Sequence, residues 1–170
     1  MAFAGTLSLS VTGTLTPDTV NDLEVQQSSI AYNPNFTINN GTGANQANTV
    51  YSDTRTLTAG SSETIDLNGG SLEDRVCDPI NLTAVKFLII RSHASSPGDL
   101  LVGPNSSNGF IAPFNAVGDR IRIKPGGLLV LVAPDATGYN VTSTTDLLYI
   151  ENGSGGGSAI YDIVFSGVDA

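Results

Sequence analysis

The feature that most constrains this fold is a succession of short apolar or alternating segments, each closed by glycine, proline, asparagine or serine. In residues 7–11, leucine and valine alternate with serine, which is the two-residue period of a half-buried strand. Turn signals return at intervals of roughly 8 to 12 residues, the spacing of strands in an all-β sandwich or barrel. No segment combines the length and the 3.6-residue period of a full helix. The pattern predicts an all-β chain.

Two continuous apolar runs, residues 85–90 and 128–133, are too short for helices and rich in branched or aromatic side chains. We expect both to be central strands that are buried on both faces. Further strands are predicted at residues 36–38, 49–57, 64–67, 120–124, 146–150 and 160–165. Strands in this number and spacing favour an antiparallel β-sandwich, and a jelly roll is the commonest way to fold eight or more of them.

The composition divides the chain into two parts. Its 170 residues suit a single domain with a core large enough to be stable unaided. Residues 1–40 are less apolar than the rest and are expected to form an N-terminal arm or edge layer. Residues 41–170 are expected to form the sandwich domain.

The charge balance excludes several partners. Sixteen acidic residues against seven basic ones give a net charge of −9 and a pI near 4.2. Because phosphate neutralisation cannot drive its binding, neither nucleic acid nor an anionic membrane is an expected partner. The single cysteine, Cys77, excludes an internal disulfide, and no apolar run approaches the length of a membrane span. With no signal-peptide pattern at the N-terminus, we expect the protein to be made in a reducing cytosol.

The residues that catalysis would require are sparse. His93, the only histidine, follows Ser92 and precedes Asp99 by six residues, which invites a Ser-His-Asp interpretation. Adjacent residues of an extended segment point to opposite faces, so Ser92 cannot pass its proton to His93. Cys77 has no histidine near it in sequence and is interpreted as a buried, inert thiol. We therefore predict no catalytic residue and expect the protein not to be an enzyme.

Metal and cofactor sites are not expected either. A zinc site needs four soft ligands, and the chain offers only His93 and Cys77. The aspartates are scattered singly and none lies in the pattern of a calcium loop, although a calcium ion shared between loops or subunits stays open. The glycine-rich segments 41–43 and 153–157 are not followed by a helix, so they lack the amide array that holds phosphate.

The candidate interface consists of basic and apolar residues. Three of the seven cations, Arg120, Arg122 and Lys124, fall on one face of a predicted strand. They either dock an acidic neighbour or protect an edge strand from pairing with other chains. Arg55 either forms an ion pair between subunits or caps an internal carboxylate. Leu7, Leu9 and Val11 in the predicted arm complete the candidate interface.

Several segments, taken in order, resemble a family of small all-β structural proteins of tailed bacteriophages, found as capsid decoration (cement) or tail-associated proteins. The segments are residues 41–48, 53–57, 85–91, 124–127, 134–139 and 161–167. The resemblance spans residues 41–167, and its motifs are strands and turns. The first 40 residues do not contribute to it.

This resemblance implies a protein without an active site or cofactor that binds the lattice of the major capsid protein, often as a homotrimer. Its location would be the capsid surface of a virion assembled in the host cytoplasm. The N-terminal segment would then be a lattice-binding arm, a strand exchanged within the trimer, or a piece of the core. The alternative is a tail-associated module that binds a receptor or glycan through loops such as residues 103–109, although only 6% of residues are aromatic.

Overall fold

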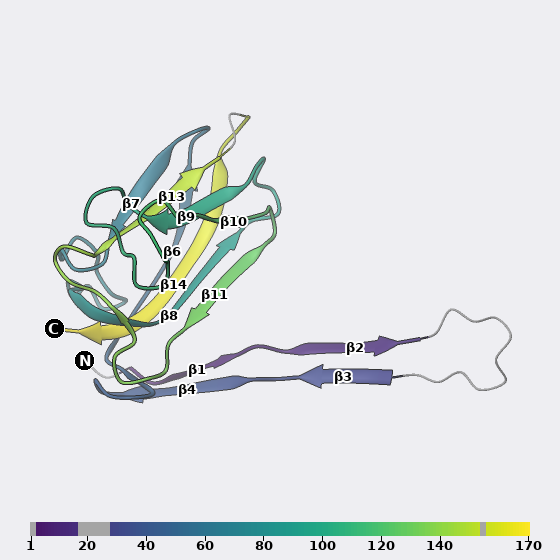
Figure 1. Ribbon diagram of the computed structural model, residues 1–170, viewed down its shortest axis with the longest axis horizontal. Coiled ribbons are helices and arrows are strands. Elements are labelled where there is room, and N and C mark those ends of the chain that lie inside the picture. The colour runs from purple at the N-terminus through teal and green to yellow at the C-terminus, as the bar shows by residue number, and fades with distance from the viewer. Residues whose placement is uncertain (1–2, 17–27, 154–155) are drawn as a thin grey trace, which may run out of the picture.

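The computed structural model describes residues 3–16, 28–153 and 156–170, and within these ranges every regular element is a strand (Figure 1). Residues 1–2 and 17–27 of the predicted arm lie outside the described residues. In the described part of the chain, no helix is long and apolar enough to cross a membrane. The strands are β1 (Gly5–Ser8), β2 (Val11–Leu15), β3 (Ser28–Tyr32), β4 (Asn35–Asn40), β5 (Gln46–Ala47), β6 (Thr49–Leu57), β7 (Ser62–Asp66), β8 (Leu82–Ser92), β9 (Leu100–Pro104), β10 (Ile121–Ile123), β11 (Leu128–Val132), β12 (Tyr139–Asn140), β13 (Leu147–Asn152) and β14 (Ala159–Asp169).

Two antiparallel sheets form a sandwich. The four-stranded sheet has the order β10-β9-β13-β7, and the five-stranded sheet has the order β11-β8-β14-β6 with β12 also paired to β8. The chain alternates between the sheets from β6 to β9 and again from β10 through β11 and β13 to β14. The predicted all-β class is confirmed, and this alternation agrees with the jelly roll expected for eight strands.

The main core lies between the two sheets. In β14, Tyr161, Ile163 and Phe165 are fully buried, because alternate residues of a strand share one face. The ring of Phe165 stacks on that of Tyr51 in β6, with centroids 4.9 Å apart. The four-stranded sheet contributes Val102, Leu148 and Ile150 from the other side, also with no exposed area.

A second, smaller core lies on the outer face of the five-stranded sheet. Ile38, Ala47 and Phe87 are buried there, and Leu7 and Val132 are among the partly buried side chains packed against them. Ile38 and Leu7 belong to the base of the N-terminal segment, where β1, β4 and β5 form a small third sheet. The five-stranded sheet therefore carries apolar side chains on both faces.

The two apolar runs predicted as central strands differ in position. Residues 85–90 lie in β8, which is flanked by β11 and β14 as expected. The prediction is wrong for residues 128–133, because β11 is an edge strand and Leu128 is 54% exposed. Its apolar side chains contact both cores, Leu131 the main core and Val132 the second. An apolar run indicates that side chains on both faces of a strand are covered. It does not indicate whether the strand is central or at an edge, because that depends on hydrogen-bonded pairing within the sheet.

Four strands, β3, β5, β9 and β12, have no counterpart among the predicted segments, and of these β9 lies inside the four-stranded sheet, between β10 and β13. Gly103 and Pro104 at its end have the appearance of a loop. The glycine is required by a close approach, because a Cβ atom at position 103 would collide with the carbonyl oxygen of Asp119.

Truncating the centre of β8 tests whether the sandwich depends on the main core. Ile90 has no exposed area, so Ile90→Ala is expected to lower the free energy of unfolding by about 3 kcal/mol through lost burial and a cavity. Val76→Ala is the control, because Val76 is 61% exposed and should change stability by less than about 0.5 kcal/mol. Urea denaturation measures both, and equal effects would contradict this account of the core.

Candidate interaction surface

The N-terminal segment is a long two-stranded antiparallel ribbon that leaves the sandwich (Figure 1). β1 pairs with β4 from Gly5 opposite Ile38, and β2 pairs with β3 from Val11 opposite Tyr32. A backbone hydrogen bond of 3.1 Å from Leu9 N to Pro34 O joins the two pairings in one register. Because cross-strand partners and alternate residues share a face, the register assigns every side chain of the ribbon to one of two sides.

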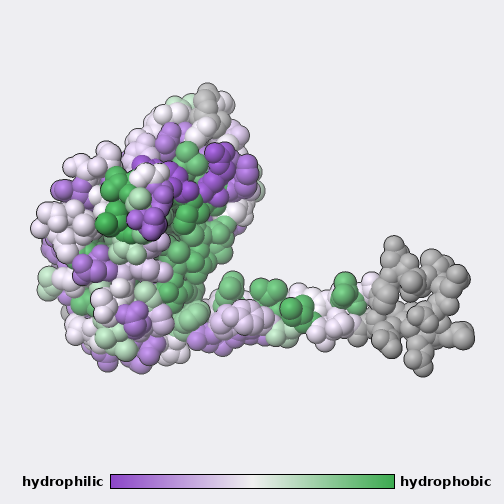
Figure 2. Space-filling view, viewed as in Figure 1, coloured by the Kyte–Doolittle hydropathy of each residue, from purple (hydrophilic) through white to green (hydrophobic). Residues whose placement is uncertain are grey.

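One side of this ribbon is apolar and the other is polar. Near the base, the apolar side carries Leu7 and Ile38, which pack on the sandwich. Farther out it carries the apolar arm face, consisting of Leu9, Val11, Leu15, Ile30 and Tyr32. The polar side carries threonine, serine and asparagine, and on it Ser10 Oγ donates a 2.6 Å hydrogen bond to Asn33 Oδ1. Figure 2 shows hydrophobic side chains along the side of the ribbon that looks toward the sandwich.

The apolar arm face has no partner within the described chain. Its members range from 42% exposed at Leu9 to 74% at Leu15, and Ile30 and Tyr32 are 60% and 61% exposed. Between β2 and β3, the missing side chain of Gly13 leaves an open groove beside Ile30. A lone two-stranded ribbon is marginally stable in water. Exposed apolar side chains gathered on one side of such a ribbon therefore mark an interaction surface.

The strands of the ribbon that the structure describes also carry no charge, whereas the segment of sequence between β2 and β3 contains Asp18, Asp22 and Glu24. Residues 3–16 and 28–40 contain no Lys, Arg, Asp or Glu, and the next charged residue along the chain is Asp53. Natural edge strands are commonly guarded by charged side chains that prevent pairing with other chains. The ribbon lacks this protection, which favours a segment made to associate.

A second apolar surface, partly exposed and bordering the second core, lies on the sandwich itself. Val130 of β11 pairs with Ile89 of β8, which in turn pairs with Val164 of β14, so three side chains form a row across the outer face. Val132 and Phe87, one row nearer the arm, are covered by the arm base. Val130, Ile89, Val164 and Leu128 are called the outer sheet face below. Figure 2 shows this hydrophobic area on the side of the sandwich that faces the arm.

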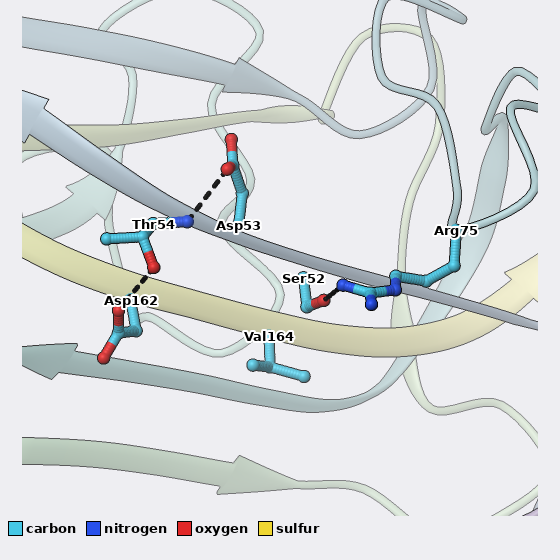
Figure 3. Close-up of a pocket in the computed structure, with 6 residues that line it drawn as sticks. All are labelled: Ser52, Asp53, Thr54, Arg75, Asp162 and Val164. Atoms are coloured by element: carbon cyan, nitrogen blue, oxygen red, sulfur yellow. Dashed lines mark hydrogen bonds between the residues drawn. The ribbon is translucent and has the colours of Figure 1, made fainter.

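The next row across the same sheet is polar. Asp162 of β14 accepts a 2.8 Å hydrogen bond from Thr54 Oγ1, and its two carboxylate oxygens each lie 3.0 Å from His93 Nε2. Arg75 reaches over β6 and donates a 3.0 Å hydrogen bond to Ser52 Oγ (Figure 3). An open depression lies between these side chains, bounded by Val164 at the apolar row.

These contacts decide the partner of the only histidine. His93 pairs with Asp162, and Ser92 lies on the inner side of the sheet, fully buried opposite Tyr161. Asp99 is engaged elsewhere, with Arg122 and Lys124. Burial opposes ionisation of Asp162, but hydrogen bonds from His93 and Thr54 outweigh it and hold the pKa of this carboxyl below its ordinary value. The arrangement is a hydrogen-bonded His-Asp pair at the surface, and Ser92 does not adjoin it.

The basic stripe, consisting of Arg120, Arg122 and Lys124, finds its contacts within the chain. Asp99 Oδ2 accepts hydrogen bonds from Arg122 Nη1 at 2.8 Å and Lys124 Nζ at 2.9 Å, and these bonds hold the pKa of Asp99 below its ordinary value. The Arg120 guanidinium lies 4.8 Å from the ring centroid of Tyr149. β10 is an edge strand, the position that protective charges favour. An acidic partner for this stripe stays a prediction.

Arg55 takes the internal role among its two predicted alternatives. It donates to Glu63 Oε2 at 2.6 Å and to the Tyr51 hydroxyl at 2.8 Å. Its Nε lies 3.1 Å from Asp53 Oδ2, an ion-pair distance without hydrogen-bond geometry. Burial opposes its charge, but the bonds to Tyr51 and Glu63 raise the pKa of Arg55 above its ordinary value. Tyr161 donates to the other oxygen of Glu63 at 2.7 Å, which ties the cluster to the core.

The interpretation of Cys77 as a buried thiol is wrong. The residue is exposed, in a turn where Asp74 accepts backbone hydrogen bonds from Val76, Cys77 and Asp78. Its φ of 67° lies in the left-handed region, where asparagine or glycine is more usual. Sequence hydrophobicity places cysteine inside on average, but the local turn places this one outside. Within the described residues, no three His, Cys, Asp or Glu side chains gather as metal ligands.

No protein-family model, curated protein or solved structure matches this chain.

Removing the Asp162 carboxylate tests the polar row. Because folding lowers the pKa of Asp162, its charge stabilises the fold above the ordinary pKa and stops doing so as pH falls through the lowered value. Asp162→Asn is expected to cost up to about 1 kcal/mol at pH 7, since the pair is partly exposed. The difference from wild type should shrink in urea denaturations below about pH 4. Asp78→Asn, in an exposed turn, is the control, and a pH-independent cost would contradict the ionic account.

Replacing Arg55 separates its internal role from an interface role. Arg55→Gln leaves Glu63 and Asp53 without their cation and is expected to lower the free energy of unfolding by about 2 kcal/mol. Arg75→Gln, which removes one exposed hydrogen bond to Ser52, should change it by less than about 0.5 kcal/mol. Thermal unfolding with light scattering checks both variants. Unchanged stability with a changed oligomeric state would instead assign Arg55 to an interface.

Proposed function

We propose that this chain is a structural protein of a tailed-phage virion, a capsid decoration (cement) protein that binds and stabilises the outer lattice of major capsid subunits. The observation that carries the proposal is the uncharged ribbon, whose apolar arm face is exposed in the single chain. Such a face is buried only in an assembly. The resemblance of residues 41–167 to phage decoration and tail-associated proteins supplies the kind of assembly.

The physical properties of the rest of the chain support this role. The sandwich has a continuous core and serves as a rigid body from which the arm extends. A net charge of −9 keeps unassembled copies soluble and repels them from nucleic acid. The only histidine, His93, lies against Asp162 on the outer side of the sheet, and the adjacent Ser92 is buried on the inner side, so these two side chains do not meet as base and nucleophile.

Stabilisation would come from many modest contacts. As a homotrimer, each decoration unit would contact the lattice at three places, and dissociation would require their simultaneous release. Such linkage raises the effective affinity by roughly 10²-fold or more where the geometry permits it. The proposed location is the capsid surface, on shells assembled in the host cytoplasm, with the major capsid protein and the chain itself as partners.

Shell binding tests the proposal. Purified wild-type protein is expected to pellet with undecorated capsid shells until the lattice sites are filled. Ile30→Lys, which places a charge on the apolar arm face, should lower retention by about tenfold or more, because linked contacts are lost. Ala31→Lys is the matched control, since the neighbouring residue lies on the opposite side of the ribbon.

Two results would count against the decoration function. Wild-type protein that fails to pellet with shells would overturn it. Binding to host cells or envelope glycans in place of shells would instead support the tail-associated alternative.

A further inference from the structure

Within one chain, the ribbon and the five-stranded sheet already pack together. At the base of the arm, Leu7 and Ile38 contact the second core, which includes Phe87 and Val132 of the outer sheet surface. The contact is apolar on both sides, and it joins the apolar side of the ribbon to the outer side of the sheet. The structure therefore contains one example of how these two surfaces fit.

Both surfaces continue beyond this contact. The ribbon continues from Leu9 to Leu15 with the apolar arm face exposed. On the sheet, Ile89 and Val164 border the second core and are only partly buried, and Val130 and the exposed Leu128 of β11 lie outside it. Past the base, the ribbon runs away from the sandwich (Figures 1 and 2), so the exposed parts of the two surfaces do not meet in the same chain.

We propose that the apolar arm face of one copy packs on the outer sheet face of a second copy, so that exchanged arms join the copies. This inference rests on the proposed function for the expectation of a homotrimer. It deepens that function by naming the partner of the arm. The contact forms between copies of the chain before any capsid shell is present.

The dimensions of the two surfaces are compatible. From Leu9 to Leu15 the ribbon extends about 20 Å, at roughly 3.3 Å per residue. The outer sheet face extends about 7 Å along β11, from Leu128 to Val130, and about 10 Å across three strands, at roughly 4.8 Å per strand. The ribbon is therefore long enough to cross this face. The groove beside Gly13 offers room for one protruding side chain, and Leu128, at 54% exposed, protrudes from the outer sheet face.

Electrostatics favours a second copy as the occupant. Two copies that each carry a net charge of −9 repel one another over most of their surfaces. The described ribbon is uncharged, and Val130, Ile89 and Val164 form an uncharged row. The described arm face and this row can meet without charge repulsion between them, and the nearest charges are Arg91 opposite Leu128 on the sheet and Asp18, Asp22 and Glu24 in the segment of sequence between β2 and β3. The edge strand β11 likewise has no charged side chain to oppose an approaching arm.

Disulfide trapping between two different variants tests the contact without shells. Both carry Cys77→Gly, which removes the exposed thiol at a positive φ suited to glycine. One variant also carries Ile30→Cys on the apolar arm face, and the other carries Val130→Cys on the outer sheet face. After mixing and mild oxidation, we expect a cross-linked product of twice the chain mass on non-reducing gels, because a disulfide needs Cα atoms within about 7 Å.

The control moves the arm cysteine to the opposite side of the ribbon. Ala31→Cys mixed with Val130→Cys should give about tenfold less product, since its side chain points away from the sheet. Equal products from the two mixtures, or no product from Ile30→Cys, would overturn the exchange of arms. If wild-type protein still pellets with shells in that case, the arm contacts the lattice and the decoration function survives. If the cross-link forms but wild-type protein does not pellet with shells, the exchange of arms is supported and the decoration function is overturned.

Discussion

The structure depends on a single sheet that buries apolar side chains on both faces. The inner face of the five-stranded sheet builds the main core with the four-stranded sheet, through residues such as Ile90 and Phe165. Its outer face holds the base of the arm through Phe87 and Val132. Burying the inner face produces the sandwich, and the excess apolar surface on the outer face fixes where the ribbon begins. Backbone hydrogen bonds, such as the 2.7 Å bond from Asn45 N to Pro134 O, also join the base of the ribbon to the sandwich.

The distribution of charge follows the same division. Several partly buried charged side chains of the sandwich are paired, as Arg55 is with Glu63 and Asp162 is with His93. The ribbon carries none in its described residues. Charge repulsion keeps most of the acidic surface from associating, and the uncharged part of the arm lacks this repulsion. This division is the physical basis for the proposed role in assembly, since specificity requires that only one surface be free to associate.

Much of the strand pattern is predictable from the sequence because burial of one face imposes a two-residue period. The bounds of β6 at Thr49–Leu57 and the strand content of residues 85–90 follow from this period. The period also locates Leu7, Leu9 and Val11 on one side of an arm. Ile30 and Tyr32 complete that side, and their alternation with Ser29 and Ala31 is a signal that a search for a partner strand could have used. β9 is hidden because its Gly103 serves a close backbone approach, which is a tertiary requirement.

The sequence by itself determined that the chain is all-β, acidic, without an internal disulfide, and uncharged in the described arm, because these properties depend on composition and on local periodicity. Only the tertiary structure decided that β11 is an edge strand, that His93 pairs with Asp162, that Arg55 is internal and that Cys77 is exposed. Each of these depends on which distant strands pair and on the turn between them. A side chain's neighbours across a sheet are set by register over tens of residues, and no local pattern contains that information.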